Sequence, residues 1–245
     1  MADPAPLPRY LQLLWGREPA GRRGPKPGRD IEDIGRAAVD IADSHGLEGV
    51  SMKAVAESIG FTSMSLYRYL DSKEELYAVM LEVAYGPPDL SLVADGTWRE
   101  QLERWARALV AALVEHPWIS HVPLTSPPVT PHVLGWTDAG ARALAGTSLS
   151  EQQKLSTLLV VDGYVRSHVR MSLSMGVVGL TEPAQSGVES YGATLRLLIN
   201  PTQFPALLAA TPELEGKEED FFESELTFGL DLVLDGIQEL IDRRS

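Results

Sequence analysis

Apolar side chains recur three or four residues apart from residue 31 onward, the spacing that gives an α-helix one buried face. The first set comprises Ile31, Ile34, Ala38, Ile41 and Ala42. His45-Gly46 ends this run, because glycine is common immediately after a helix. The pattern predicts a helix from residue 31 to about residue 45.

Hydroxyl residues in N-cap positions predict three further short helices before Pro87-Pro88. These residues are Ser51, Thr62 and Ser72. Gly60 ends the helix that follows Ser51. Glu75 lies three residues after Ser72 and completes a predicted capping box. Residues 30–85 are therefore expected to hold four helices with no strand between them.

Longer helices are predicted after residue 88. They cover residues 97–116, 150–175, 184–199 and 221–241, with a proline-bounded piece at 201–210. Five prolines within residues 116–136 predict a loop with short helical pieces, because proline interrupts helical hydrogen bonding. The expected fold is all-α, with a small helical head and a larger helical body.

The segment SIGFTSM at residues 58–64 joins two short helices through a tight turn that contains glycine, as in a helix-turn-helix. The second helix of such a motif enters the major groove of DNA. Here that helix opens with hydroxyl residues and sets Tyr67, Arg68 and Tyr69 side by side. A helix whose only role was packing would carry fewer polar side chains. The alternative is a solvated, partly packed helix face.

Residues 31–76 resemble the DNA-binding head of the TetR family of transcriptional repressors. The resemblance rests on the turn glycine, the hydroxyl residues after it, Leu66-Tyr67, Tyr69, and Ser72-Lys73 with Leu76. It implies three parts. They are a flexible basic arm at 1–29, a helix-turn-helix DNA-binding head at 30–85, and a helical ligand-binding and dimerisation body at 86–245.

The resemblance also implies roles for single residues. Thr62, Ser63, Met64 and Ser65 would face the groove, and Met64 could alternatively pack. Arg68 would read a base edge, Lys53 a base or a phosphate, and Ser51, Tyr67, Tyr69 and Lys73 would hold phosphates. Arg22 and Arg23 lie in an arm that resembles minor-groove arms, with a solvated leader as the alternative.

Charge is unevenly distributed along the chain, whose formal net charge is −13. Residues 1–29 carry six positive and two negative charges, whereas residues 30–85 carry four against eleven. An acidic bulk repels DNA except where a basic patch is presented. The charge therefore leaves open a second class of function, a helical protein-binding adaptor with an acidic surface that has lost DNA binding.

The last predicted helix carries apolar residues suited to a homodimer interface, because helix-turn-helix heads usually work as two-fold pairs. The candidates are Phe222, Leu226, Leu230, Val233 and Ile237, with Gly229 and Gly236 for close approach and Leu158 from helix 150–175. Phe221, Phe228 and Leu232 make a second apolar face. The alternative is a helix buried centrally in one chain.

The family resemblance also implies a small-molecule effector bound in the body. The candidate ligand-binding residues are Trp118, His121, Trp136, Tyr164, His168, Met171 and Met175. Aromatic and methionine side chains suit an apolar cavity and favour a largely hydrophobic ligand, although core packing is the alternative for each.

No catalytic residue set, phosphate loop or dinucleotide motif is recognisable, so an enzyme is not expected and no cofactor is predicted. The chain has no cysteine and no close cluster of metal-ligating side chains, so no metal site is predicted. No apolar run is long enough for a signal peptide or a membrane span, which predicts a cytoplasmic protein. The expected partners are double-stranded operator DNA, a small-molecule effector and a second copy of the chain.

Overall fold

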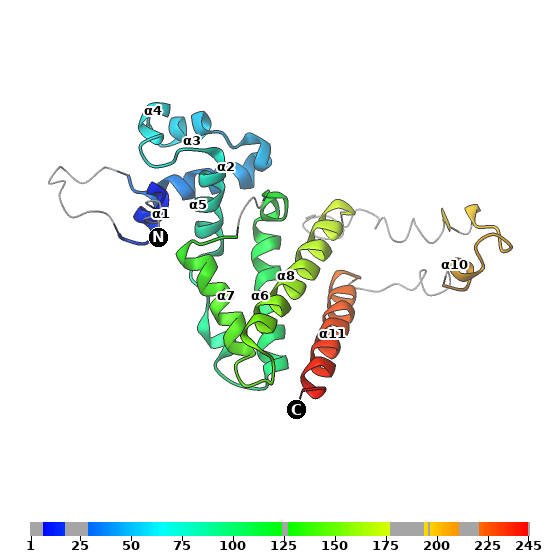
Figure 1. The fold of residues 1–245 in the computed structure, drawn as a ribbon. Helices are drawn as coiled ribbons and strands as arrows, with labels where there is room; N and C mark the ends of the chain where they lie inside the picture. The colour runs from blue at the N-terminus through cyan, green and yellow to red at the C-terminus, as the bar shows by residue number, and fades with distance from the viewer. Residues whose placement is uncertain are drawn as a thin grey trace, which may run out of the picture. The chain divides into compact units, whose positions relative to one another are not determined.

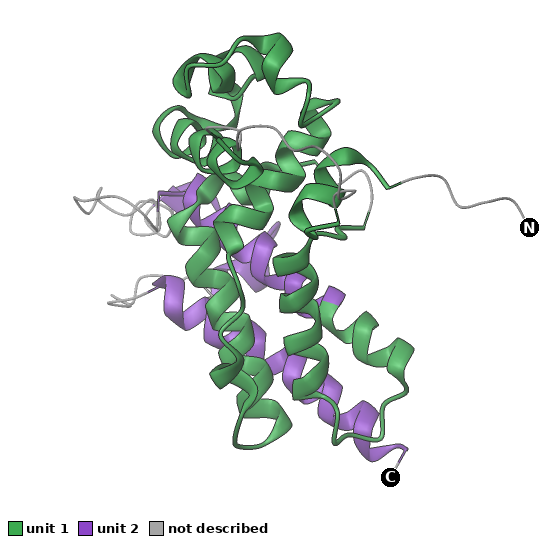
Figure 2. Cartoon of the chain, turned by 90° about the vertical axis from the view of Figure 1, so that its left-hand side faces the viewer, with its two compact units in different colours: residues 1–158 green, residues 159–245 purple. Residues whose placement is uncertain are grey.

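The computed structural model describes residues 7–17, 29–123, 127–176, 194–195, 197–210 and 221–244. These residues form helices and turns, without a strand among them, which confirms the all-α prediction. Figure 1 shows the helices in chain order. The chain divides into two compact units, residues 1–158 and residues 159–245, coloured separately in Figure 2.

The first unit contains the head. Its helices are α1 (Arg9–Leu14), α2 (Ile31–Gly49), α3 (Met52–Ser58), α4 (Ser63–Leu66) and α5 (Lys73–Tyr85). Helices α2 and α5 pack against each other at Gly35, where an added Cβ would lie 2.6 Å from Val83 Cγ2. The backbones approach closely there because Gly35 has no side chain. α1 packs on α2.

The three predicted N-caps of the head are confirmed. The side chains of Ser51, Thr62 and Ser72 accept hydrogen bonds from the backbone N–H groups of Ala54, Ser65 and Glu75. The predicted capping box at Ser72 is wrong in one detail. The Glu75 carboxylate accepts from the backbone N–H of Asp71 at 2.6 Å instead of from that of Ser72. Its burial raises the pKa of this carboxyl group.

Two glycines with positive φ mark breaks in the helical course of the head. α2 is interrupted at Gly46, with φ of 71°, which is where the sequence predicted its end. Gly60 has φ of 73° and begins the turn into α4. Glycine adopts this region of backbone space with little steric cost, so both breaks follow from the residue type.

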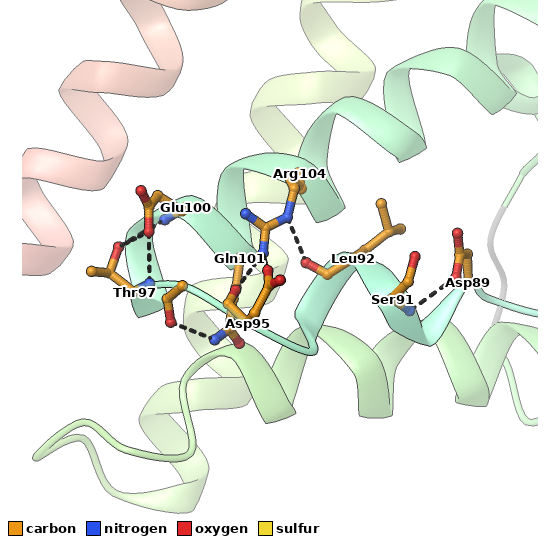
Figure 3. Close-up of polar contacts among 9 residues, drawn as sticks. Asp89, Ser91, Leu92, Asp95, Thr97, Glu100, Gln101 and Arg104 are labelled. Carbon is orange, nitrogen blue, oxygen red and sulfur yellow. Dashed lines mark hydrogen bonds and ion pairs between the residues drawn. The ribbon is translucent and has the colours of Figure 1, made fainter.

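The body begins in the same unit with η1 (Leu90–Val93), α6 (Trp98–Glu115), η2 (Pro117–His121) and α7 (Pro131–Ala143). Thr97 and Glu100 form a capping box at the start of α6. Figure 3 shows how Arg104 fastens the preceding turn: its guanidinium donates to the carbonyl oxygen of Leu92 at 2.9 Å and to that of Asp95 at 2.5 Å. The prediction of a loop through residue 136 is wrong, because α7 starts at Pro131.

α8 (Glu151–Ser174) crosses from the first unit into the second, which also holds α10 (Pro205–Ala210) and α11 (Phe221–Asp242). At the start of α8, the side chains of Ser150 and Gln153 each accept a hydrogen bond from the backbone N–H of the other residue. Within the second unit, the Tyr164 hydroxyl donates to the carbonyl oxygen of Glu225 at 2.7 Å. Most of the helix predicted at 184–199 lies outside the described residues.

Candidate DNA-binding surface and its links to the body

The recognition helix presents one face to the interior and another to solvent. Leu66 and Leu70 are fully buried and anchor α4 and the turn after it. Met64 is 76% exposed, and Tyr67 and Arg68 are exposed beside it. Within the part of the chain that the structure describes, no hydrogen bond or ion pair engages the Arg68 side chain. Its guanidinium therefore remains available to an acceptor from outside the chain.

Hydroxyl groups at the start of α4 are organised by helix capping. Thr62 Oγ1 lies 2.9 Å from Ser65 Oγ and accepts the backbone N–H of Ser65. Ser63, the first residue of the helix, is half-buried. Ser51 Oγ caps α3 in the same manner, at 3.1 Å from Ala54 N. A capping hydroxyl accepts through its oxygen and keeps its own proton, so such a group can still donate to a phosphate.

Lys53, Tyr69 and Lys73 each have a contact within the chain. Lys53 is exposed on α3, with its ammonium 3.8 Å from the Glu57 carboxylate. The Tyr69 hydroxyl donates to the carbonyl oxygen of Arg29 at 3.3 Å. The Lys73 ammonium lies 5.3 Å from the centre of the Tyr77 ring. The predicted phosphate contacts of Tyr69 and Lys73 would compete with these interactions. Arg22 and Arg23 lie outside the described residues.

Asp43 on α2 is a carboxylate that joins the head to the body. Its Oδ1 accepts from His116 Nδ1–H at 2.8 Å and from Trp118 Nε1–H at 2.6 Å. His116 follows α6 directly, and the Trp118 side chain is buried in η2. One carboxylate oxygen on α2 thus holds the end of α6 and the start of η2.

Glu82 on α5 is a second such carboxylate and is 3% exposed. Its two oxygens lie 2.8 Å and 2.9 Å from the backbone nitrogen of His132, and Val133 N lies 3.4 Å from Oε2. These donors are at the N-terminus of α7, where backbone N–H groups have no partner within their own helix. Thr130, the N-cap residue of α7, makes no side-chain cap. Glu82 therefore caps α7 from a different helix.

Neither carboxylate was singled out from the sequence. Their partners lie 73 and 75 residues away for Asp43 and 50 residues away for Glu82. Glu82 does carry one sequence signal, because it lies within a helix whose neighbouring positions Met80 and Leu81 are apolar and buried. A charged residue in a strongly apolar helix is a candidate for a specific partner.

The residues predicted to bind an effector are split between the two units. Trp118 and Trp136 are buried in the first unit, and their indole N–H groups donate to Asp43 and to the carbonyl oxygens of Tyr85 and Gly86. His121 is exposed, with Nδ1 3.1 Å from Ser120 Oγ. The two tryptophans therefore have structural roles in joining helices, and the structure does not bring them together into one described cavity with His121.

Of the other four candidates, Tyr164, His168 and Met171 lie on α8 in the second unit, and Met175 follows the end of that helix directly. The His168 Nε2–H donates to the Phe222 carbonyl oxygen at 3.1 Å, and its ring stacks on Tyr164. Burial lowers the pKa of His168, although the Phe222 carbonyl and Glu225 and Glu223 act in the opposite direction. Met171 and Met175 are exposed. Tyr164 and His168 thus join α8 to α11.

The predicted dimer residues divide into buried and accessible ones. Leu158, Leu226, Leu230 and Ile237 are buried in the single chain, and Phe222 and Val233 are half-buried. Gly229 accommodates the chain's own Tyr164, whose hydroxyl would collide with a Cβ there, so this glycine serves packing within the chain. Gly236 is exposed with no atom within 4 Å of an added Cβ.

The exposed apolar side chains of this unit belong to other positions. They include Leu159 at 74%, Phe228 at 64% and Leu232 at 59%. Phe228 and Leu232 belong to the second apolar face recognised in the sequence. The predicted stripe of Leu226, Leu230 and Ile237 is thus covered within the single chain, whereas Phe228 and Leu232 on the opposite stripe are exposed. The dimer interface itself stays a prediction.

Comparisons with known proteins agree with this architecture. Residues 34–80 match the family described as bacterial regulatory proteins, tetR family, and residues 91–241 match the tetracyclin repressor-like C-terminal domain. The chain is 33% identical over 248 aligned positions to the HTH-type transcriptional repressor DrrR1 of Streptomyces coeruleorubidus. That alignment covers 97% of this chain and 88% of the relative.

Two solved structures extend the comparison. A protein described as a possible TetR family regulator from Streptomyces coelicolor A3(2) is 26% identical, with a TM-score of 0.66 over 86% of this chain and all of the other (100%). ActR of Streptomyces coelicolor, solved with actinorhodin, shares the fold with a TM-score of 0.73 at 18% identity, over 86% and 96% of the two chains. No helix of the described residues is long and apolar enough to cross a membrane. The chain belongs to the TetR family of DNA-binding transcriptional regulators.

Proposed function

We propose that the protein is a repressor that binds a palindromic operator as a homodimer and is released by a small, largely hydrophobic effector. The observation that carries the proposal is the exposed face of the recognition helix. Met64, Tyr67 and Arg68 are solvated there while Leu66 and Leu70 hold the helix rigidly from behind. An exposed methionine and tyrosine, beside an arginine that has no partner among the described residues, suit a surface that is covered in a complex.

Arg68 is the proposed base reader. A guanidinium can donate two hydrogen bonds to the O6 and N7 acceptors of guanine, which discriminates against other bases by about 1–3 kcal/mol. Tyr67, beside it, is proposed to hold a phosphate through its hydroxyl. Lys73 would do the same at the start of α5, after leaving the Tyr77 ring. Phosphate contacts fix the register of the protein on DNA and carry no sequence information.

The proposed dimer uses the exposed apolar stripe of the second unit. Leu159, Phe228 and Leu232 would be buried between subunits, which removes their apolar surface from water. Two heads related by two-fold symmetry can then reach successive major grooves about 34–36 Å apart. The palindromic form of the operator follows from that symmetry.

The proposed effector response passes through the joints made by Asp43 and Glu82. Each carboxylate belongs to a head helix: Asp43 binds groups at the end of α6 and in η2, and Glu82 binds backbone N–H groups at the start of α7. Movement of α6 or α7 is therefore transmitted to α2 and α5. An effector shifts DNA binding only to the extent that it binds the two arrangements with different affinity.

The test is a selection from random duplex DNA with the full-length protein, followed by fluorescence anisotropy on the enriched sequence across a salt series. We expect a palindromic sequence whose affinity falls steeply with salt. Arg68→Ala should relax selection at one position of each half-site. Lys73→Ala should weaken binding to all sequences alike, and Tyr67→Phe should act in the same way but less strongly.

Enrichment of no sequence at low salt would refute the DNA-binding proposal and favour the acidic adaptor. Specific binding that does not change with saturating effector would refute only the ligand response. Arg107→Ala on α6, which lies outside the head, is the matched control for loss of one positive charge, and it should leave the selected sequence unchanged.

A further inference from the structure

A pocket lies within the first unit between α1, α5 and the segment that leads into α7. Tyr10 comes from α1, Tyr77 and Leu81 from α5, and Val133 from α7. It contains about 460 Å³ of space not filled by protein atoms, part of which is open to solvent. None of the seven residues predicted to bind the effector lines this pocket.

Thr130 gives the pocket an available hydrogen-bonding group. Thr130 is one of the residues that line the pocket and is 1% exposed, and its Oγ1 has no hydrogen-bond partner among the described residues. Thr130 occupies the N-cap position of α7, where a hydroxyl normally accepts a backbone N–H. Glu82 occupies the nearby N–H groups of α7 instead. Buried polar groups almost always have partners, so this hydroxyl requires an explanation.

The remaining lining restricts what the pocket can accept. Tyr77 and Leu81 are buried and line it together with Pro123, Pro127, Pro128 and Val129. The lining residues include no Lys, Arg or His. Glu74 is exposed at the pocket, and hydrogen bonds from its own backbone N–H and from Ser72 lower the pKa of its carboxyl group. An ionised carboxylate repels anions, and the apolar walls disfavour any strongly charged molecule.

We propose that this pocket binds an uncharged organic molecule of about the size of one ring, whose single polar group hydrogen-bonds the hydroxyl of Thr130. A molecule bound there contacts α5 of the head and the start of α7 together. It therefore acts at the joint that Glu82 forms, as a second regulatory site separate from the proposed effector site. The α1 helix is required for the site because Tyr10 forms one of its walls.

Phenol is the probe that tests the proposal, with ¹⁵N-labelled full-length protein observed by NMR. The Trp15 indole N–H donates to the carbonyl oxygen of Val129 at 3.1 Å, and Val129 lines the pocket, so the Trp15 indole resonance reports on occupancy. Phenol should shift this resonance saturably. Toluene, which has the ring without the hydroxyl, should bind about two- to tenfold more weakly, and benzoate should not bind.

Variants distinguish this pocket from a nonspecific site. Thr130→Val keeps the side-chain shape and removes the hydroxyl, so phenol should bind it about as weakly as toluene binds the parent, a loss of about two- to tenfold. Ala78→Leu fills the pocket from α5 and should abolish the shift. Thr137→Val is the matched control on the same helix, because the Thr137 hydroxyl bonds the Val133 carbonyl within α7 and does not line the pocket.

The proposal is overturned if phenol gives no saturable shift, or if Ala78→Leu binds it as well as the parent protein does. Circular dichroism melts establish whether each variant is folded. Should Thr130→Val fail to fold, the comparison of phenol with toluene and the Ala78→Leu variant still decide the outcome. None of these measurements involves DNA, so failure here is distinguishable from failure of the repressor proposal.

Discussion

Glu82→Ala removes the carboxylate that caps α7 from α5, and its cost can be worked out from the contacts. The substitution deletes the short hydrogen bond that His132 N donates to the carboxylate. A hydrogen bond to a charged acceptor contributes about 1.5–3 kcal/mol. It also deletes the favourable placement of a negative charge at a helix N-terminus, worth about 0.3–1 kcal/mol. We therefore expect the free energy of unfolding to fall by about 3 kcal/mol. Glu82→Gln keeps an acceptor oxygen and should cost about 1 kcal/mol.

Urea denaturation followed by circular dichroism measures these losses from the shift of the unfolding midpoint. A second substitution separates the effect of losing the α7 cap from the effect of losing the contact between α5 and α7. Glu82→Ala combined with Thr130→Asp supplies a carboxylate from the N-cap residue of α7 itself. Because Asp is among the strongest N-cap residues, the double variant should recover about 1 kcal/mol or more of the lost stability. It should not recover the contact between α5 and α7.

DNA affinity then shows whether that contact matters for regulation. If Glu82 transmits movement of α7 to the head, the double variant should bind operator DNA but respond weakly to effector. A loss below about 1 kcal/mol for Glu82→Ala would refute the buried-cap reasoning, because a charged acceptor lost from a buried donor costs more than that. An unchanged effector response in the stable double variant would refute the role of Glu82 in transmission.

Three further predictions concern the second unit. Gly229→Ala should lower the free energy of unfolding by about 1–3 kcal/mol, because the new Cβ meets the Tyr164 ring. Gly236→Ala, on the same helix, should raise it by up to about 1 kcal/mol. Urea titration measures both changes, and equal effects would contradict this packing. Leu232→Glu should convert a dimer into monomers in sedimentation velocity, and a persistent dimer would place the interface elsewhere. Burial lowers the pKa of His168 from 6.5, so the unfolded chain takes up this proton more readily. The stability that comes from keeping His168 neutral is present above pH 6.5 and is lost as the pH falls through the pKa of the folded protein. His168→Gln should make the melting temperature depend less on pH, and an unchanged pH profile would contradict this prediction.

The head was predictable because its signals are local. Ser51, Thr62 and Ser72 each accept from the backbone N–H three residues later, so sequence spacing alone identifies the helix starts. The exposure of Met64 on the recognition helix also agrees with the groove-facing role predicted for it, although contact with DNA stays a prediction. Local spacing fails at Glu75, since Asp71 N, four residues before it, competes successfully for the same carboxylate.

α7 was missed because its first residue, Pro131, was interpreted as a helix breaker. Proline disrupts the interior of a helix, but it is favourable at the first helical position, where its missing N–H has no intrahelical acceptor. The same helix start depends on Glu82, which lies 50 residues earlier in the sequence. The cap that completes α7 was therefore absent from the local sequence and could not be inferred from it.

The orientation of α11 illustrates a different limit. Its sequence has two apolar stripes, and helical periodicity cannot decide which one the chain itself covers. Tyr164 decides it: the hydroxyl bonds the carbonyl oxygens of Glu225 and Leu226, and the ring passes over Gly229. That choice leaves Phe228 and Leu232 exposed, which a single chain does not need for its own folding. Large exposed apolar side chains on one helix face favour association with another molecule, and the proposed dimer would cover them with the same stripe of a second copy.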